Sequence, residues 1–158
     1  GSWTCRGYGG TQVLFSEGDL RQSVFYGEVG PWYEAGAFES FAAFNHAGET
    51  VEWRLDQGRP FATIRRWFVS TGEDDRGKPR PEVQVLVISR VGQPSDGEAC
   101  VVGYVEATAN PDANEIARRV ADEEARDFAC RYAEPMWHGT RRATEVEPMR
   151  DFGERGME

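Results

Sequence analysis

The sequence has few of the residue types on which most catalytic and metal-binding sites depend. Its 158 residues include two histidines, three cysteines and a single lysine. His46 and His138 stand beside no serine motif of the kind that a Ser/His/Asp triad requires. No Cys-x-x-Cys or His-x-x-x-His spacing indicates a zinc site. The sequence therefore predicts no catalytic residue, no metal site and no cofactor, and it favours a protein that is not an enzyme.

A basic surface and a long apolar segment are also missing. The net charge is −9, from 18 basic and 27 acidic side chains, whereas binding to DNA, RNA or anionic lipid needs a positively charged surface. No apolar run approaches the roughly 20 residues of a membrane-spanning helix. We therefore expect no nucleic-acid partner and no membrane span, and we expect a protein or a small ligand as the partner.

One spacing resembles a calcium-binding loop but fails at two positions. Asn110, Asp112 and Asn114 match the first three ligand positions of an EF-hand. Glu115 stands where that loop needs glycine, and Ala121 stands where it needs glutamate. Asn110 is instead typical of the residue that caps the start of a helix.

Alternating apolar and polar residues predict strands along much of the chain. Val51, Trp53 and Leu55 share one face, and a second strand follows a turn at 56–59, so that 50–69 reads as a hairpin. The segment 82–89 is apolar on both faces at its centre, as in an interior strand. Further strands are expected at 11–17, 20–26 and 100–107.

A helix pattern follows the last of these strands. Ile116, Ala117 and Val120 belong to an apolar stripe that predicts a helix over 113–130. We therefore predict the α+β class, a mainly antiparallel sheet of about six strands with one long C-terminal helix packed on one face. The hairpin 50–69 and the strands 82–90 and 99–107 form its centre. A single globular domain covers 3–138, and 139–158 is a polar, weakly ordered tail.

The three cysteines leave several pairings open. A strand over 100–107 rises about 23 Å, and a helix over 113–130 rises about 26 Å. A helix that folds back antiparallel on this strand would bring Cys130 beside Cys100, so we favour a Cys100–Cys130 disulfide. Cys5 could pair with either of them, and three reduced, buried thiols are the other alternative. A disulfide predicts an oxidising compartment, periplasmic or secreted.

The segment 32–47 is dense in aromatic residues and is the candidate binding surface. The alternative is a loop or short helix that covers the core. The predicted binding residues are Trp32, Tyr33, Phe38 and His46. A rival hypothesis places an acid–base pair at His46 and the glutamates near it in the sequence, Glu39, Glu49 and Glu52.

Two stretches carry a resemblance to a known group of proteins. They are Gly58-Arg-Pro-Phe-Ala-Thr-Ile-Arg-Arg-Trp67 and the pattern Cys100…Tyr104-Val-Glu-Ala107…Asn110-Pro-Asp-Ala-Asn114…Phe128…Cys130. Over residues 3–138 the chain resembles a group of small exported (periplasmic) proteins of alphaproteobacteria. The resemblance implies export and a Cys100–Cys130 bridge, and it implies no activity.

These features predict an exported, non-enzymatic binding or protein-interaction domain of the bacterial envelope. Two alternatives stay open. One is a small periplasmic hydrolase-type enzyme that uses a His/Glu acid–base pair. The other is a structural subunit of an envelope complex, with 139–158 as its docking segment.

Overall fold

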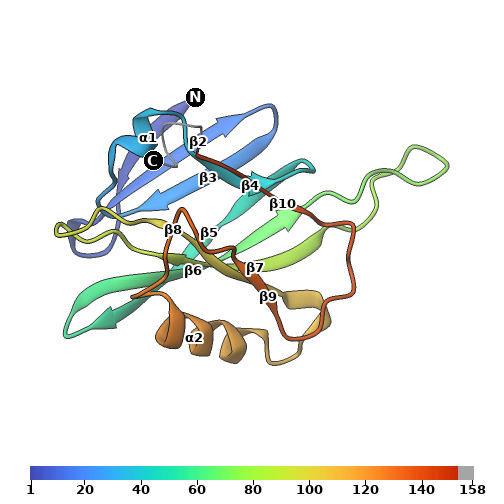
Figure 1. Ribbon diagram of the computed structural model, residues 1–158. Helices are drawn as coiled ribbons and strands as arrows, with labels where there is room; N and C mark the ends of the chain where they lie inside the picture. Colours follow the sequence, from blue (N-terminus) through green and yellow to red (C-terminus); the bar gives the residue numbers. More distant parts are fainter. Residues whose placement is uncertain (153–158) are drawn as a thin grey trace.

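Two β-sheets pack face to face, and a helix covers the outer face of the larger sheet (Figure 1). The computed structural model describes residues 1–152. The larger sheet has the strand order β5-β6-β7-β8-β9 and is antiparallel except for β9, which runs parallel to β8. Its strands are β5 (Asn45–Asp56), β6 (Arg59–Val69), β7 (Val83–Arg90), β8 (Cys100–Glu106) and β9 (Met136–His138).

The smaller sheet is an antiparallel meander in the order β1-β2-β3. A short helix, α1, follows it, and a separate antiparallel pair joins β4 to β10. The bounds of these elements are β1 (Ser2–Arg6), β2 (Gln12–Gly18), β3 (Arg21–Tyr26), α1 (Pro31–Glu34), β4 (Phe38–Phe41) and β10 (Pro148–Asp151).

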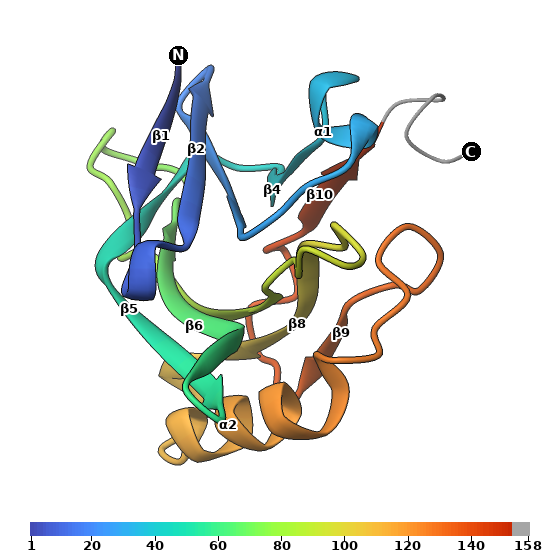
Figure 2. The same ribbon diagram turned by 90° about the vertical axis from the view of Figure 1, so that its left-hand side faces the viewer.

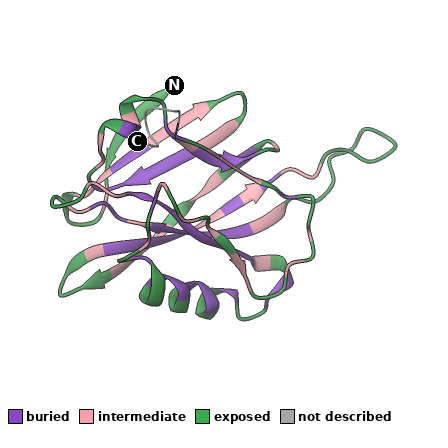
Figure 3. Cartoon of the chain, in the orientation of Figure 1, coloured by how far each residue is buried: buried purple, intermediate pink, exposed green. Residues whose placement is uncertain are grey.

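The central strand β7 shows how the core is built. Val85 and Val87 pack toward the smaller sheet, whereas Leu86 and Ile88 pack toward the helix α2. Both faces of the strand are therefore buried, which explains its nearly continuous apolar sequence. Burial follows the same pattern along the neighbouring strands and along the inner face of α2 (Figure 3). The predicted hairpin 50–69 and the interior strand are confirmed.

The predicted fold class is wrong, because the chain is mostly β. The helix α2 spans Ala113–Glu124, a length of 12 residues, and not 113–130. Within residues 1–152 the other α-helix is α1, which has four residues. The apolar stripe of α2 is confirmed as a buried face. The strands predicted at 11–17 and 20–26 exist, but they form a second sheet with β1 instead of extending the first.

The segment after β9 belongs to the domain as far as it is described. Asn110 does not cap α2 with its side chain; its amide group donates to the carbonyl oxygens of Glu106 and Thr140, and its Oδ1 accepts from the Thr140 amide. Further along, β10 pairs with β4, and Val146 and Phe152 are buried. The weakly ordered tail predicted from residue 139 is therefore incorrect up to residue 152, and 153–158 lie outside the described residues.

The Cys100–Cys130 disulfide is confirmed, with Cα atoms 5.5 Å apart, and Cys5 is free and exposed. The prediction that the chain after β8 runs back to the start of that strand is correct, even though the helix ends at Glu124. The turns after Ala125 continue in the same direction and bring Cys130 to the start of β8. The bridge indicates an oxidising compartment. Among the described residues, no helix is long and apolar enough to cross a membrane.

Candidate functional site

The predicted aromatic surface is largely part of the core. Trp32 is only 4% exposed, and its ring lies 5.1 Å from that of Phe25 and 5.6 Å from that of Phe152. Tyr33 is half-buried against Phe25, and Phe38 is half-buried at the start of β4. The strand β10 brings Phe152 to this cluster, so the chain itself supplies the apolar partner. Trp32 is therefore a packing residue and does not form an open binding surface.

His46 lies apart from that cluster. It is exposed, stacks on Phe68 with ring centroids 5.1 Å apart, and has its Nδ1 atom 3.8 Å from a carboxylate oxygen of Glu82. The glutamate that the structure brings to His46 is thus none of the three suggested by the sequence. Glu52 forms an ion pair with Arg118, and Glu39 is buried between the sheets. The four predicted binding residues do not converge on one site.

A different site is built at the end of the sandwich that faces the viewer in Figure 2. There the turn between β5 and β6, the connection between β7 and β8, and the chain just after α2 enclose a hollow of about 480 Å³. We call it the arginine hollow. The side chains that define its charge are Arg59, Arg90, Arg126, Asp56 and Asp96. Its volume is within the range of small-ligand sites.

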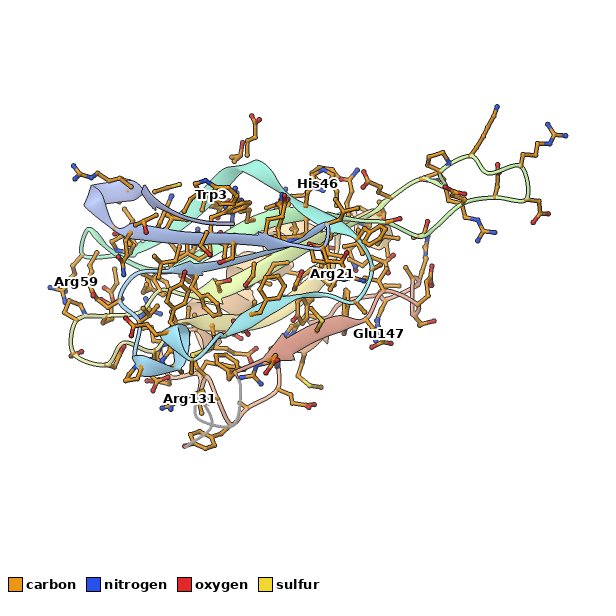
Figure 4. The ribbon with its side chains drawn as sticks, turned by 90° about the horizontal axis from the view of Figure 1, so that it is seen from above. Trp3, Arg21, His46, Arg59, Arg131 and Glu147 are labelled. Carbon is orange, nitrogen blue, oxygen red and sulfur yellow. A yellow bond between two sulfur atoms is a disulfide. The ribbon has the colours of Figure 1, made fainter. Side chains whose placement is uncertain are left out.

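Local sequence fixes the position of Arg59. Gln57 and Gly58 both have positive φ, 50° and 79°, which is the backbone of the tight hairpin turns that match strand twist. Asp56 and Arg59 are therefore paired across the turn. Arg59 lies at one extremity of the molecule, well separated from His46 (Figure 4). Phe68, the partner of His46, is nine positions after Arg59 on β6, about 30 Å along the strand.

The other two arginines of the hollow are already neutralised. Arg90 lies 2.9 Å from a carboxylate oxygen of Asp96 and donates to the carbonyl oxygen of Phe128. Arg126 forms an ion pair of 3.3 Å with Asp56, and its guanidinium carbon lies 3.6 Å from the ring centre of Phe61. Each of the two aspartates thus matches one arginine.

Arg59 carries the charge that is left over. It is exposed, and among residues 1–152 it has no hydrogen bond or ion pair from its side chain. The arginine hollow therefore holds one unmatched positive charge in a chain whose net charge is −9. A guanidinium group offers a planar set of donors that fits a carboxylate.

A second hollow of about 620 Å³ adjoins the first and shares Gln57, Arg59, Val91 and Gln93 with it. We call it the glycine hollow, because Gly9, Gly10, Gly27, Gly58 and Gly92 line it. Gly27 and Gly92 form a parallel bridge, and the Glu28 amide donates to the Gly92 carbonyl oxygen. A Cβ atom on Gly92 would overlap the Glu28 main chain. Only glycine permits this close approach.

The walls of the two hollows are held in place by the protein's own hydrogen bonds. The Gln93 side chain donates to the carbonyl oxygens of Pro60 and Val91, which fastens the β7–β8 connection to the start of β6. Within that connection, Asp96 accepts from the amides of Gln93 and Glu98. The site is therefore preformed, which reduces the entropy lost when a ligand binds.

Glu39 is a buried acid that belongs to the core and not to either hollow. One of its oxygens accepts from the Val101 amide, and the other lies 3.4 Å from Nε of Arg150. Burial raises the pKa of Glu39 to about 7, although the Val101 amide and Arg150 oppose the rise. Tyr104 faces the same interior space, and burial, with the Glu39 charge beside it, raises the pKa of its phenol. That space is only about 10 Å³, too small for any ligand larger than water.

Comparison of the chain with models of known protein families, with curated proteins and with solved structures found no match. The residues of the two hollows therefore carry the functional inference by themselves. The sequence indicates the turn at 56–59 but not its role. Arg59, Arg90 and Arg126 are three of many arginines in the chain, and no local motif distinguishes them.

Proposed function

We propose that this protein is an exported, non-enzymatic binding protein whose ligand is a small organic carboxylate held by Arg59 in the arginine hollow. The observation that carries the proposal is the unmatched guanidinium of Arg59 beside two arginines that are already paired. An acidic chain repels anions overall, so a local positive charge at a preformed hollow favours their binding at this one place.

The proposed location is the bacterial periplasm. The support for it is the Cys100–Cys130 disulfide, because such bridges persist in oxidising compartments. Detection of the bridge by intact mass in protein taken from the envelope of an exporting host would agree with this location. A fully reduced protein confined to the cytoplasm would contradict it.

Replacing Arg59 with glutamine should weaken carboxylate binding about tenfold, because the charge-assisted pair is lost while a polar side chain is kept at this position. The measurement is a titration of the amide resonances at pH 7 with N-acetyl-alanine, which carries one carboxylate. Binding to the unmodified protein should weaken as salt is added, as expected for an exposed charge.

Arg76→Gln is the matched control. Arg76 is an exposed arginine in the segment 70–82 and lines neither hollow. That segment projects from the side of the molecule opposite the turn between β5 and β6 (Figure 1). The main-chain amide of Arg76 donates to the carboxylate of Asp74, and this hydrogen bond does not involve the guanidinium. Affinity in this variant should stay within about twofold of the unmodified protein. Equal affinity in the Arg59 and Arg76 variants would contradict the proposed site.

A further inference from the structure

The two hollows form one continuous surface at the end of the sandwich. Gln57, Arg59, Val91 and Gln93 belong to both of them. A ligand whose carboxylate reaches Arg59 therefore has a second, larger space beside it. Because five glycines line that space, its walls offer main-chain groups with few side chains in front of them. The amides of Gly10, Gly27 and Gly92 already donate to carbonyl oxygens within the protein, so these walls offer a ligand mainly carbonyl oxygens as hydrogen-bond acceptors.

The glycine hollow also holds a charge of the opposite sign. Glu28 lines it, is exposed, and has no ion pair from its carboxylate within the described chain. Glu28 comes from the connection after β3, and Arg59 comes from the turn between β5 and β6. The glycine hollow is thus bounded by an unpaired acid and an unpaired base on different walls. Among residues 1–152, no other charged side chain lines it.

Resting on the proposed function, we propose that the ligand is a short peptide with two free termini. Its carboxylate pairs with Arg59, its ammonium group pairs with Glu28, and its main chain lies in the glycine hollow. This class of ligand matches the three features of the site, which are an anion-binding group, a cation-binding group and a polar main-chain surface between them. Glu28 is the residue that distinguishes a peptide from a simple carboxylate.

The test is an amide-resonance titration at pH 7 with tri-alanine and with N-acetyl-tri-alanine. Acetylation removes the ammonium charge and keeps the carboxylate. It should weaken binding to the unmodified protein about fivefold, the upper end for an exposed ion pair. In Glu28→Gln, acetylation should have no further effect, because the two changes remove the same interaction. In the control Glu49→Gln, an exposed glutamate on β5 that lines neither hollow, the fivefold effect should persist.

The outcomes separate this inference from the proposed function. Equal affinity for the free and the acetylated tripeptide, with both weakened by Arg59→Gln, would overturn the peptide ligand and leave the carboxylate site in place. Equal affinity for alanine and tri-alanine would overturn the requirement for a peptide. If Arg59→Gln changes neither tripeptide nor N-acetyl-alanine binding, both proposals fail.

Discussion

Replacing Cys100 and Cys130 together with alanine should lower the free energy of unfolding by about 4 kcal/mol. The bridge joins residues 30 positions apart, and closing a loop of that length in the unfolded chain is worth about 3.7 kcal/mol in the chain-entropy model. Both side chains are also buried in the core beside Trp32 and Phe25. Alanine is the suitable replacement because it introduces no polar group there. Urea unfolding at pH 7 measures the loss.

Cys5→Ala is the control, because Cys5 is free and exposed. It should change stability by less than about 0.5 kcal/mol. A loss below about 1 kcal/mol in the double alanine variant would show that the bridge is not a main source of stability. The same variant should also bind N-acetyl-alanine less tightly. The bridge joins the start of β8 to the segment that follows Arg126. The connection that precedes β8, and Arg126 itself, line the arginine hollow.

Replacing Glu39 with glutamine should remove a pH dependence of stability of about 3 kcal/mol. Burial raises the pKa of Glu39 from the ordinary 4.5 to about 7. The folded state therefore holds this proton more tightly than the unfolded state. The resulting stabilisation is fully present below about pH 4.5 and is lost as the pH rises through 7. The two pKa values differ by about 2.5. Because a difference of one in pKa corresponds to about 1.36 kcal/mol, the stabilisation is about 3 kcal/mol.

Unfolding in urea between pH 4 and pH 8.5 measures this effect as a difference between two proteins. Other groups change stability with pH in both, so the relevant quantity is the stability of the unmodified protein minus that of Glu39→Gln. It should fall by about 3 kcal/mol across the range. Glu49 is at an exposed position. The free energy of unfolding of Glu49→Gln should therefore change with pH in the same way as that of the unmodified protein. A constant difference between the unmodified protein and Glu39→Gln would mean that Glu39 is not held protonated by burial.

The centre of the larger sheet could be predicted because its sequence signals are local. Val51, Trp53 and Leu55 alternate with polar residues, and the run at 83–90 is apolar on both faces. Alternation shows which residues are buried, but it does not show which strands join one sheet. The sequence therefore predicts β2 and β3 in the same sheet as the hairpin, whereas they form a separate sheet with β1 that packs across the core.

The length of α2 and the role of the aromatic segment depend on distant partners. The apolar stripe of α2 continues in the sequence to Ala125 and Phe128, but the chain turns there and Arg90 binds the Phe128 carbonyl oxygen. The sequence around Trp32 fits a surface position and a core position equally well. Only the contact of its ring with Phe152, which is distant in the sequence, shows that it belongs to the core. Neither contact has a signal in the neighbouring sequence.

The candidate site could not be predicted from the sequence. Glu28, Arg59, Arg90 and Arg126 come from four separate segments, and pairing with Asp96 and Asp56 decides which arginine keeps an unmatched charge. The glycines at 27 and 92 read as chain breaks, whereas in the fold their contact shapes the floor of a hollow.

The arginine hollow is tested most directly by mapping where a carboxylate binds. The amide resonances of the unmodified protein would be assigned and followed at pH 7 while N-acetyl-alanine is added. We expect the shifts to centre on Gln57, Arg59 and the connection 91–97, and to disappear in Arg59→Gln. Shifts confined to residues 32–46, or no saturable shift at any amide, would contradict the arginine hollow as the binding site.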